Sequence, residues 1–201
     1  MNKKISLLAI LTLLLTTPIL AQDYVNMSVT EMKIPIRELK RNAITGNIGW
    51  NGLTGFGVTF NHYIFKQLEV DMGLGMASTG FKFGGRMSCL FMDKNFSPFV
   101  SAGFMYGTGS SLEIDYDQNN NQFSYIVEPS PFIQIAGGVE YMANGGFLIR
   151  GNLGWAILLK QSNYRITKGV PTADELTAMD IALGSGIVIE FSIGYAFGGG
   201  K

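Results

Sequence analysis

The sequence predicts an all-β protein, specifically an eight-stranded antiparallel up-and-down transmembrane β-barrel. Large apolar residues alternate with small or polar ones over most of the chain after residue 42, and a period of two is that of a β-strand. The second face is rich in Gly, Ala and Ser, which indicates a crowded barrel interior. Although 47% of the residues are hydrophobic, no long apolar run follows residue 21. That combination separates a membrane barrel from a helical membrane protein.

The alternation is clearest between Asp180 and Phe197. Most odd-numbered residues there are large and apolar, whereas the even-numbered ones are mostly Gly, Ala and Ser, with Glu190 among them. We therefore expect one strand over this stretch, with its apolar face in lipid. Tyr195 and Phe197 would end the strand at the depth of an aromatic girdle.

The first 42 residues do not belong to the predicted barrel. Residues 1–21 carry Lys3 and Lys4 before a short apolar run, which predicts a cleaved signal peptide. Residues 22–42 do not alternate and are interpreted as a periplasmic lead-in of uncertain order, or as a short partner-binding segment. The barrel domain is expected over residues 43–201. Cleavage would leave 13 basic and 15 acidic residues, a net charge of −2, which gives no basic surface for nucleic acid.

The seven strands that precede the last one follow from the same alternation. They are predicted at residues 43–50, 55–64, 68–77, 81–92, from about 99, 132–142 and 147–159. A turn at Thr79-Gly80 and a turn-rich break at Asp93–Pro98 separate neighbouring strands. Connections are short after the second, fourth and sixth strands and long after the fifth and seventh, which predicts periplasmic termini and external loops.

The C-terminal residues Glu190-Phe191-Ser192-Ile193-Gly194-Tyr195-Ala196-Phe197 end in an aromatic residue. With them, residues 43–197 resemble the small outer-membrane barrels of the OmpA/OmpX type. The resemblance implies a Gram-negative outer-membrane location and contact with outer-membrane lipid and the barrel-assembly machinery. The assembly signal would comprise Phe191, Ile193, Tyr195 and Phe197. The residues predicted to form the aromatic girdle are Trp50, Tyr106, Tyr141, Phe147 and Trp155.

Charged residues on the inward face are the most informative candidate site. They are Glu69, Asp71, Lys82, Arg86, Glu140, Arg150 and Glu190. A three-residue hairpin loop at residues 144–146 would place Glu140 opposite Arg150, and the turn at residues 79–80 would place Arg86 diagonal to Asp71. Two interpretations stay open, a lumen plugged by paired charges and a charged conduit for ions or small solutes.

Two motifs bear on catalysis and metal binding. His62 is the only histidine, and the alternation places it on the outward face with no acid nearby on that face, which argues against a general base and for a non-enzyme. Asp115-x-Asp117-x-Asn119 is similar to the start of a calcium loop, but Asn120 replaces the required Gly. We therefore predict no metal site and no cofactor.

The two long connections are the candidate interaction surfaces. Residues 112–127 alternate on both sides of Asn119-Asn120-Asn121, which predicts a projecting hairpin, and residues 164–167 resemble another strand. Loops 110–131 and 160–179 are thus expected to bind an extracellular protein or surface ligand. The leading hypothesis is a non-enzymatic surface barrel with a role in surface interaction or envelope integrity; the alternative is a narrow porin-like channel.

Overall fold

Eight strands form a closed antiparallel barrel in the computed structural model, which describes residues 34–118 and 121–198. The barrel strands are β1 (Asn42–Trp50), β2 (Phe56–Phe65), β3 (Leu68–Ala77), β4 (Gly80–Leu90), β5 (Phe96–Gly107), β8 (Ser130–Met142), β9 (Phe147–Leu158) and β11 (Gly186–Phe197). Each pairs with its neighbour along the chain, and β1 pairs with β11 to close the ring. The predicted fold class is confirmed. The predicted signal peptide and residues 22–33 lie outside the described residues.

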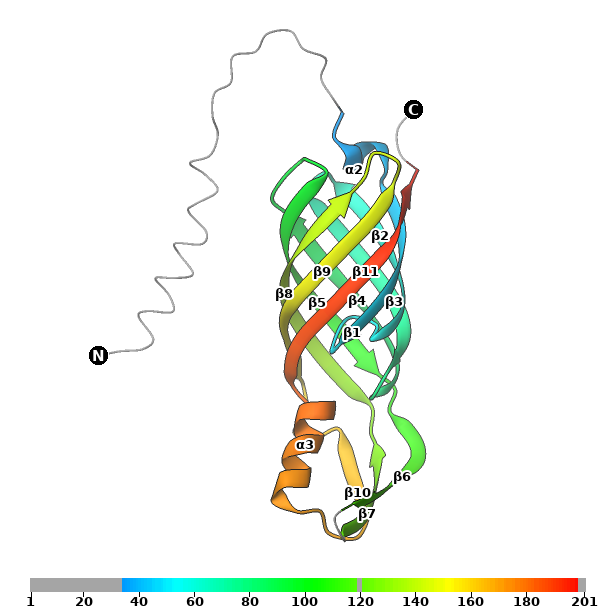
Figure 1. Cartoon of the computed structure of the whole chain (residues 1–201), viewed down its shortest axis with the longest axis vertical. Coiled ribbons are helices and arrows are strands. Elements are labelled where there is room, and N and C mark those ends of the chain that lie inside the picture. Colours follow the sequence, from blue (N-terminus) through cyan, green and yellow to red (C-terminus); the bar gives the residue numbers. More distant parts are fainter. Residues whose placement is uncertain (1–33, 119–120, 199–201) are drawn as a thin grey trace, which may run out of the picture. The chain divides into compact units, whose positions relative to one another are not determined.

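A second, smaller sheet lies at one end of the barrel, and we call it, with its helix, the end module. It contains β6 (Ser110–Gln118), β7 (Asn121–Val127), β10 (Tyr164–Lys168) and α3 (Ala173–Leu183), with sheet order β10-β7-β6. Figure 1 shows it beyond one barrel end and the short helix α2 (Ile36–Leu39) at the other. The two predicted projecting segments thus join into one folded unit. None of the described helices is long and apolar enough to cross a membrane.

Helix α3 corrects the prediction that the last strand begins at Asp180. Residues 180–183 belong to the helix, and the strand begins at Gly186. The helix starts at a capping box in which the Thr172 side chain accepts from the Glu175 backbone N–H and the Glu175 carboxylate accepts from the Thr172 N–H. Both contacts satisfy amide groups that an uncapped helix would leave without partners.

Other strand boundaries also differ from the prediction. The turn after β3 is Ser78-Thr79 rather than Thr79-Gly80, so Asp71 lies directly opposite Arg86 and not diagonal to it. Strand β5 begins at Phe96, inside the predicted break, and β4 ends at Leu90 rather than residue 92. β1 begins one residue early, at Asn42. Each difference lies at a strand end, where alternation carries the least information.

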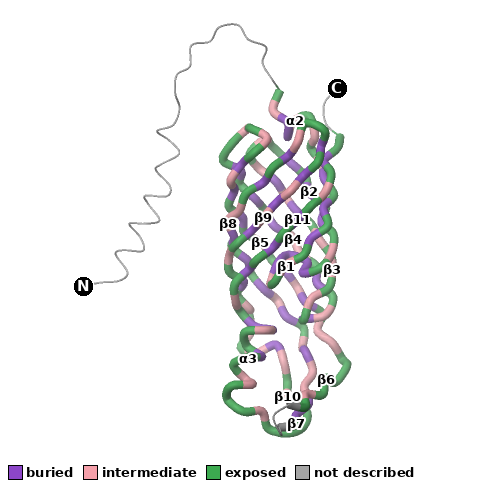
Figure 2. The backbone as a smooth tube through the Cα atoms, viewed as in Figure 1, coloured by how far each residue is buried: buried purple, intermediate pink, exposed green. Residues whose placement is uncertain are grey.

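Burial alternates along the barrel strands, as Figure 2 shows in colour. In β11, Ile187, Ile189 and Phe191 are exposed, whereas Val188 and Glu190 are buried. The large apolar face therefore points out of the barrel and the small face points in, as the alternation predicts. An exterior this apolar is what a barrel in lipid requires.

Many inward positions are glycine because the backbone of the neighbouring strand leaves no room for a side chain. A Cβ at Gly57 or Gly154 would overlap the backbone carbonyl oxygen of Leu74 or Ile135, respectively. At the outward-facing Gly151, nothing lies within 4 Å of the same position. The small inward face is thus a steric requirement of this narrow barrel.

A charged side chain should lower the stability of the protein where it faces lipid, but not where it faces water. Ile189→Arg places a cation on the exposed barrel face and should lower the free energy of unfolding by about 2–4 kcal/mol in a refolding titration from lipid vesicles. The matched control is Ile181→Arg on α3, because Ile181 is 63% exposed and Ile189 58%. Equal costs for the two variants would contradict a lipid-facing exterior.

Candidate functional site

The barrel interior is layered, with charged residues between two apolar clusters. The cluster near α2 includes Tyr63, Leu90, Phe99, Met142 and Leu148. The cluster near the end module contains Leu53, Met105, Phe132, Ala156 and Val188. All seven inward charges predicted from the sequence are buried, at 3% exposure or less. The interior is the candidate functional site because buried charges need specific partners.

Arg150 is the centre of the charged layer. Strand β9 places it directly opposite Glu140 of β8, in the register predicted from the hairpin loop. Its guanidinium bonds Glu140 at 2.6 Å and Asp71 of β3 at 3.0 Å, and it also pairs with Glu69. The guanidinium stacks 4.7 Å from the centre of the Phe99 ring. One arginine thus joins three carboxylates contributed by strands on both sides of the lumen.

Arg86 extends the network toward the end module. Its Nε donates to Asp71 at 2.8 Å, and Nη1 donates to Glu190 at 2.8 Å. The Glu190 carboxylate also accepts from the Asn152 amide at 2.8 Å and from the Leu53 backbone N–H at 2.6 Å. The network therefore runs from Arg150 to the loop that follows β1.

That loop folds into the barrel instead of projecting from it. Leu53 and Thr54 are both fully buried, and Leu53 belongs to the cluster near the end module. Lys82 is predicted as part of the charge network, but its ammonium group donates to the carbonyl of Gly52 at 2.7 Å. Among the described residues, no carboxylate forms an ion pair with it. The loop thus covers the interior at this end.

Arg37 is a network member that the sequence analysis missed. It comes from α2, in the segment interpreted as a lead-in, and its side chain is 1% exposed. Its Nε donates to Glu140 at 2.9 Å, and Nη1 donates to the carbonyls of Met92 and Lys94 at 3.2 and 2.7 Å. The predicted set has four acids and three bases, and Arg37 supplies the fourth base. That imbalance was the signal that could have found it.

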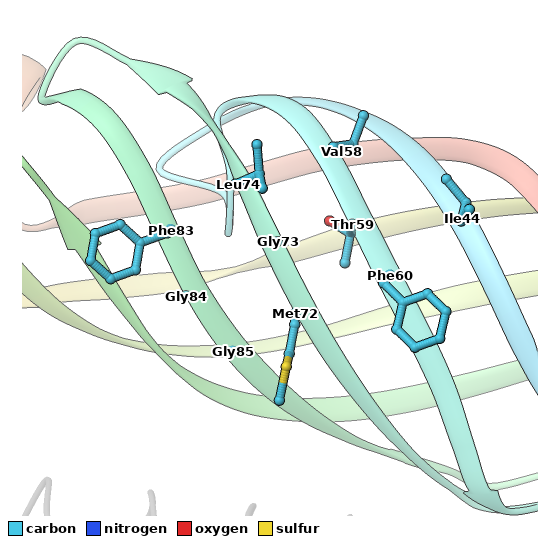
Figure 3. A pocket seen from close by; sticks show the side chains of 10 residues that line it. All are labelled: Ile44, Val58, Thr59, Phe60, Met72, Gly73, Leu74, Phe83, Gly84 and Gly85. Atoms are coloured by element: carbon cyan, nitrogen blue, oxygen red, sulfur yellow. The ribbon is translucent and has the colours of Figure 1, made fainter.

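The barrel exterior carries His62, the residue considered for catalysis, and an apolar hollow. His62 is exposed, as predicted, and its Nδ1 lies 2.8 Å from the Asn42 amide oxygen. An apolar hollow of about 640 Å³ on strands β1–β4 includes Phe60, Met72 and Phe83 (Figure 3). Of the residues that line it, only Thr59 has a polar side chain, and Thr59 is bonded to Asn47 inside the barrel. The hollow therefore offers no group that could orient a reaction.

The predicted girdle residues lie on the outer face near the barrel ends, and the predicted assembly residues lie on the outer face of β11. Trp50, Tyr106 and Trp155 are near the end module, and Tyr141 and Phe147 are near α2, as the strand directions and pairings require. Phe191, Ile193, Tyr195 and Phe197 alternate outward on β11 and pair with β1. The proposed assembly signal is thus part of the strand that closes the barrel.

The acids of strand β6 are held by hydrogen bonds. Asp115 accepts from Ser124 at 2.7 Å and Asp117 from Gln122 at 2.9 Å; Asn119, the third residue of the calcium-like motif, lies outside the described residues. The Thr167 hydroxyl, then the Lys168 ammonium, hold the pKa of Glu113 below its usual range. Among the described residues, no group of three or more His, Cys, Asp or Glu is arranged to hold a metal ion.

The fold and interior define a class: a closed eight-stranded barrel with an apolar exterior and a charged, side-chain-filled interior. No family model and no curated protein matches the chain. Among solved structures, it is similar to the N-terminal β-barrel domain of Pseudomonas aeruginosa OprF. The identity is 13% and the TM-score 0.46, and the match covers 78% of this chain and 96% of the other.

The contact between Glu140 and Arg150 can be measured with a double-mutant cycle. Each single change, Glu140→Gln or Arg150→Met, leaves buried charge without a partner and should cost about 3–5 kcal/mol of unfolding free energy. The double variant should cost at least 1 kcal/mol less than the sum, by the usual coupling of contacting groups. Refolding titrations of the four proteins give the coupling.

The exposed pair Lys66–Asp93, 2.6 Å apart, is the matched control. Lys66→Met and Asp93→Asn should couple by only about 0–1 kcal/mol, because solvent screens this pair. Additive losses at residues 140 and 150 would contradict the buried network.

Proposed function

We propose that this protein is a non-enzymatic outer-membrane β-barrel whose lumen is plugged by its own side chains and which displays the end module outside the cell. The observation that carries the proposal is the buried network from Arg37 through Glu140, Arg150 and Arg86 to Glu190. Its members are bonded to one another across the lumen, so they occupy the space that a conducting pore would need for water.

The two apolar clusters support a closed lumen. An ion that follows the barrel axis would have to pass Phe99, Met142 and Leu148 at one end and Leu53, Met105 and Phe132 at the other. These side chains offer no replacement for the hydration shell of an ion, and dehydration in an apolar environment is costly. The interior contains four buried acids and four buried bases, so its formal charge is zero.

The exterior supports the membrane location. Apolar side chains around the barrel are widely exposed; Phe56 is 69% exposed, Met72 66% and Leu153 63%. A monomer in water rarely exposes a continuous apolar surface of this kind. Because the number of strands is even, the first strand begins and the last strand ends on the side of α2. The opposite side carries the long connections and the end module, and we propose that it faces outward.

The placement of His62 supports a non-enzymatic role. Its ring is on the exterior and is bonded to Asn42, and neither cross-strand neighbour of His62, Asn42 or Val70, is an acid or a nucleophile. A general base needs the proton donor within hydrogen-bond reach. We therefore propose that the protein acts through surface interactions of its barrel exterior and its end module.

Conductance separates the plugged lumen from the porin-like alternative. The wild-type protein inserted in a planar lipid bilayer should give no steady current in concentrated KCl. Arg37→Ala combined with Leu53→Ala removes a side chain from each end of the plug and should increase the frequency of brief openings. Uniform, long-lived single-channel steps from the wild-type protein would instead support the channel.

The end module should be dispensable for barrel folding. Replacing residues 112–127 with Asn-Gly and residues 164–183 with a short Gly-Ser link should leave a barrel that shifts on a gel when heated, because the barrel strands make their contacts without the module. Capture of surface partners and adhesion should be lost, whereas solute permeability should not change. Loss of solute uptake in this variant would favour the channel.

A deletion of residues 112–127 alone is the control. Met179 and Leu183 of α3 pack against Phe123 and Val127 of β7, so removal of the hairpin exposes them. This variant should refold with a lower yield than the one that lacks the whole module. Equal yields would show that α3 does not depend on β7.

A further inference from the structure

The end module contains a groove of about 580 Å³ between the sheet and α3. Its floor is formed by apolar and aromatic side chains of β6 and β7, and its wall by one face of α3. The Ser78 hydroxyl, from the β3–β4 turn, closes one end by donating to the carbonyl of Ala182 at 3.2 Å. A cavity of this size is in the range that binds small molecules.

The groove exists because α3 covers only part of the sheet. Met179 and Leu183 are buried against Phe123 and Val127 of the central strand β7. The neighbouring stripe of the helix presents Ala178 and Ala182, whose methyl groups are too short to fill the space above β6. Ile114 of β6 is consequently 39% exposed on the groove floor.

Aromatic rings form a continuous row on the floor. The Tyr116 and Phe123 ring centres are 4.8 Å apart, and those of Phe123 and Tyr125 are 6.1 Å apart. Cross-strand pairing fixes this row, because Tyr116 lies opposite Phe123 and Ile114 opposite Tyr125. Phe123 is covered by α3, at 3% exposure, whereas Tyr116 and Tyr125 on either side of it are half-buried. The two tyrosine rings can therefore meet a flat apolar ligand or a cation.

The charge of the groove has one sign. Of the twelve residues that line it, Asp174 and Glu175 are acidic and none is basic. The Glu175 carboxylate is bonded to Thr172 in the capping box, whereas Asp174 is exposed one residue earlier in the first turn of α3. The arrangement complements a ligand that has a positive charge on an aromatic or apolar body.

We infer that this groove binds a small aromatic amine, with its ring against the half-buried Tyr116 and Tyr125 and its ammonium group toward Asp174. The inference assigns a class of ligand to the end module. It rests on the proposed function only in that the module, and so the ligand, would be outside the cell. Binding itself requires the folded module and no membrane.

Three indole derivatives that differ in charge test the inference. Tryptamine is cationic at neutral pH, tryptophol is neutral and indole-3-acetate is anionic, and all share one ring. Calorimetric titration of the full chain refolded in zwitterionic detergent, corrected with protein-free micelles, should show tryptamine binding about threefold to tenfold more tightly than tryptophol. Indole-3-acetate should bind most weakly.

Two variants assign the binding to the groove. Ala178→Phe fills the space and should abolish the binding of tryptamine; Thr177→Phe adds the same ring one residue earlier on α3, outside the groove lining, and should have no effect. Asp174→Asn should weaken tryptamine binding about twofold to fivefold and leave tryptophol unchanged. Asp117→Asn is its charge-matched control, because Asp117 does not line this groove.

Equal affinity for tryptamine and tryptophol, tighter binding of indole-3-acetate, or full binding by Ala178→Phe would each overturn the inference. If Ala178→Phe fails the heat-shift assay for folding, Ala182→Leu fills the same groove with a smaller group and decides the question. A silent groove in a protein that passes no current would overturn this inference and leave the plugged barrel in place. A conducting protein that binds tryptamine would do the reverse.

Discussion

The contact of Arg150 with Glu69, Asp71 and Glu140 is the interaction on which the rest of the barrel depends. Three carboxylates buried together would repel one another, and their desolvation would be prohibitive without a shared cation. That cation must reach across the lumen from β9 to β3, so strand number, register and diameter all have to be correct at once. Arg86 and Arg37 then neutralise the remaining carboxylate charge on either side of this centre.

The narrow interior explains the composition of the inward face. Long charged side chains fill the middle of the lumen and large apolar ones fill the two ends. Many of the remaining inward positions must therefore be small, and a Cβ at Gly57 or Gly154 would strike the neighbouring strand. The outward face carries no such restriction and is filled with large apolar groups. The alternation of size along β11 is therefore the consequence of one steric constraint and one solvent constraint that act on opposite faces.

Because both constraints repeat every second residue, the sequence predicts the barrel strands and the buried charges well. It fails where the period stops. Arg37 precedes the first strand, so no alternation indicates that it turns inward, although three bases against four acids called for another cation. Asp180 to Leu183 continue the alternation by coincidence, but they belong to α3. The Thr172–Glu175 capping box is the sequence signal that indicates the start of this helix. The β3–β4 register depended on a turn that contains two candidate positions, and alternation cannot distinguish registers that differ by two residues.

The barrel and the end module solve different physical problems, and this difference locates the proposed activity. Within the barrel, the charged side chains are bonded to one another and lie between two clusters of packed apolar side chains. In the end module, α3 buries Met179 and Leu183 but presents Ala178 and Ala182 to an aromatic floor, so packing there is incomplete. Incomplete packing next to a rigid scaffold costs some stability and yields a preformed cavity. A sealed barrel would then act as the anchor that holds this cavity at the membrane surface.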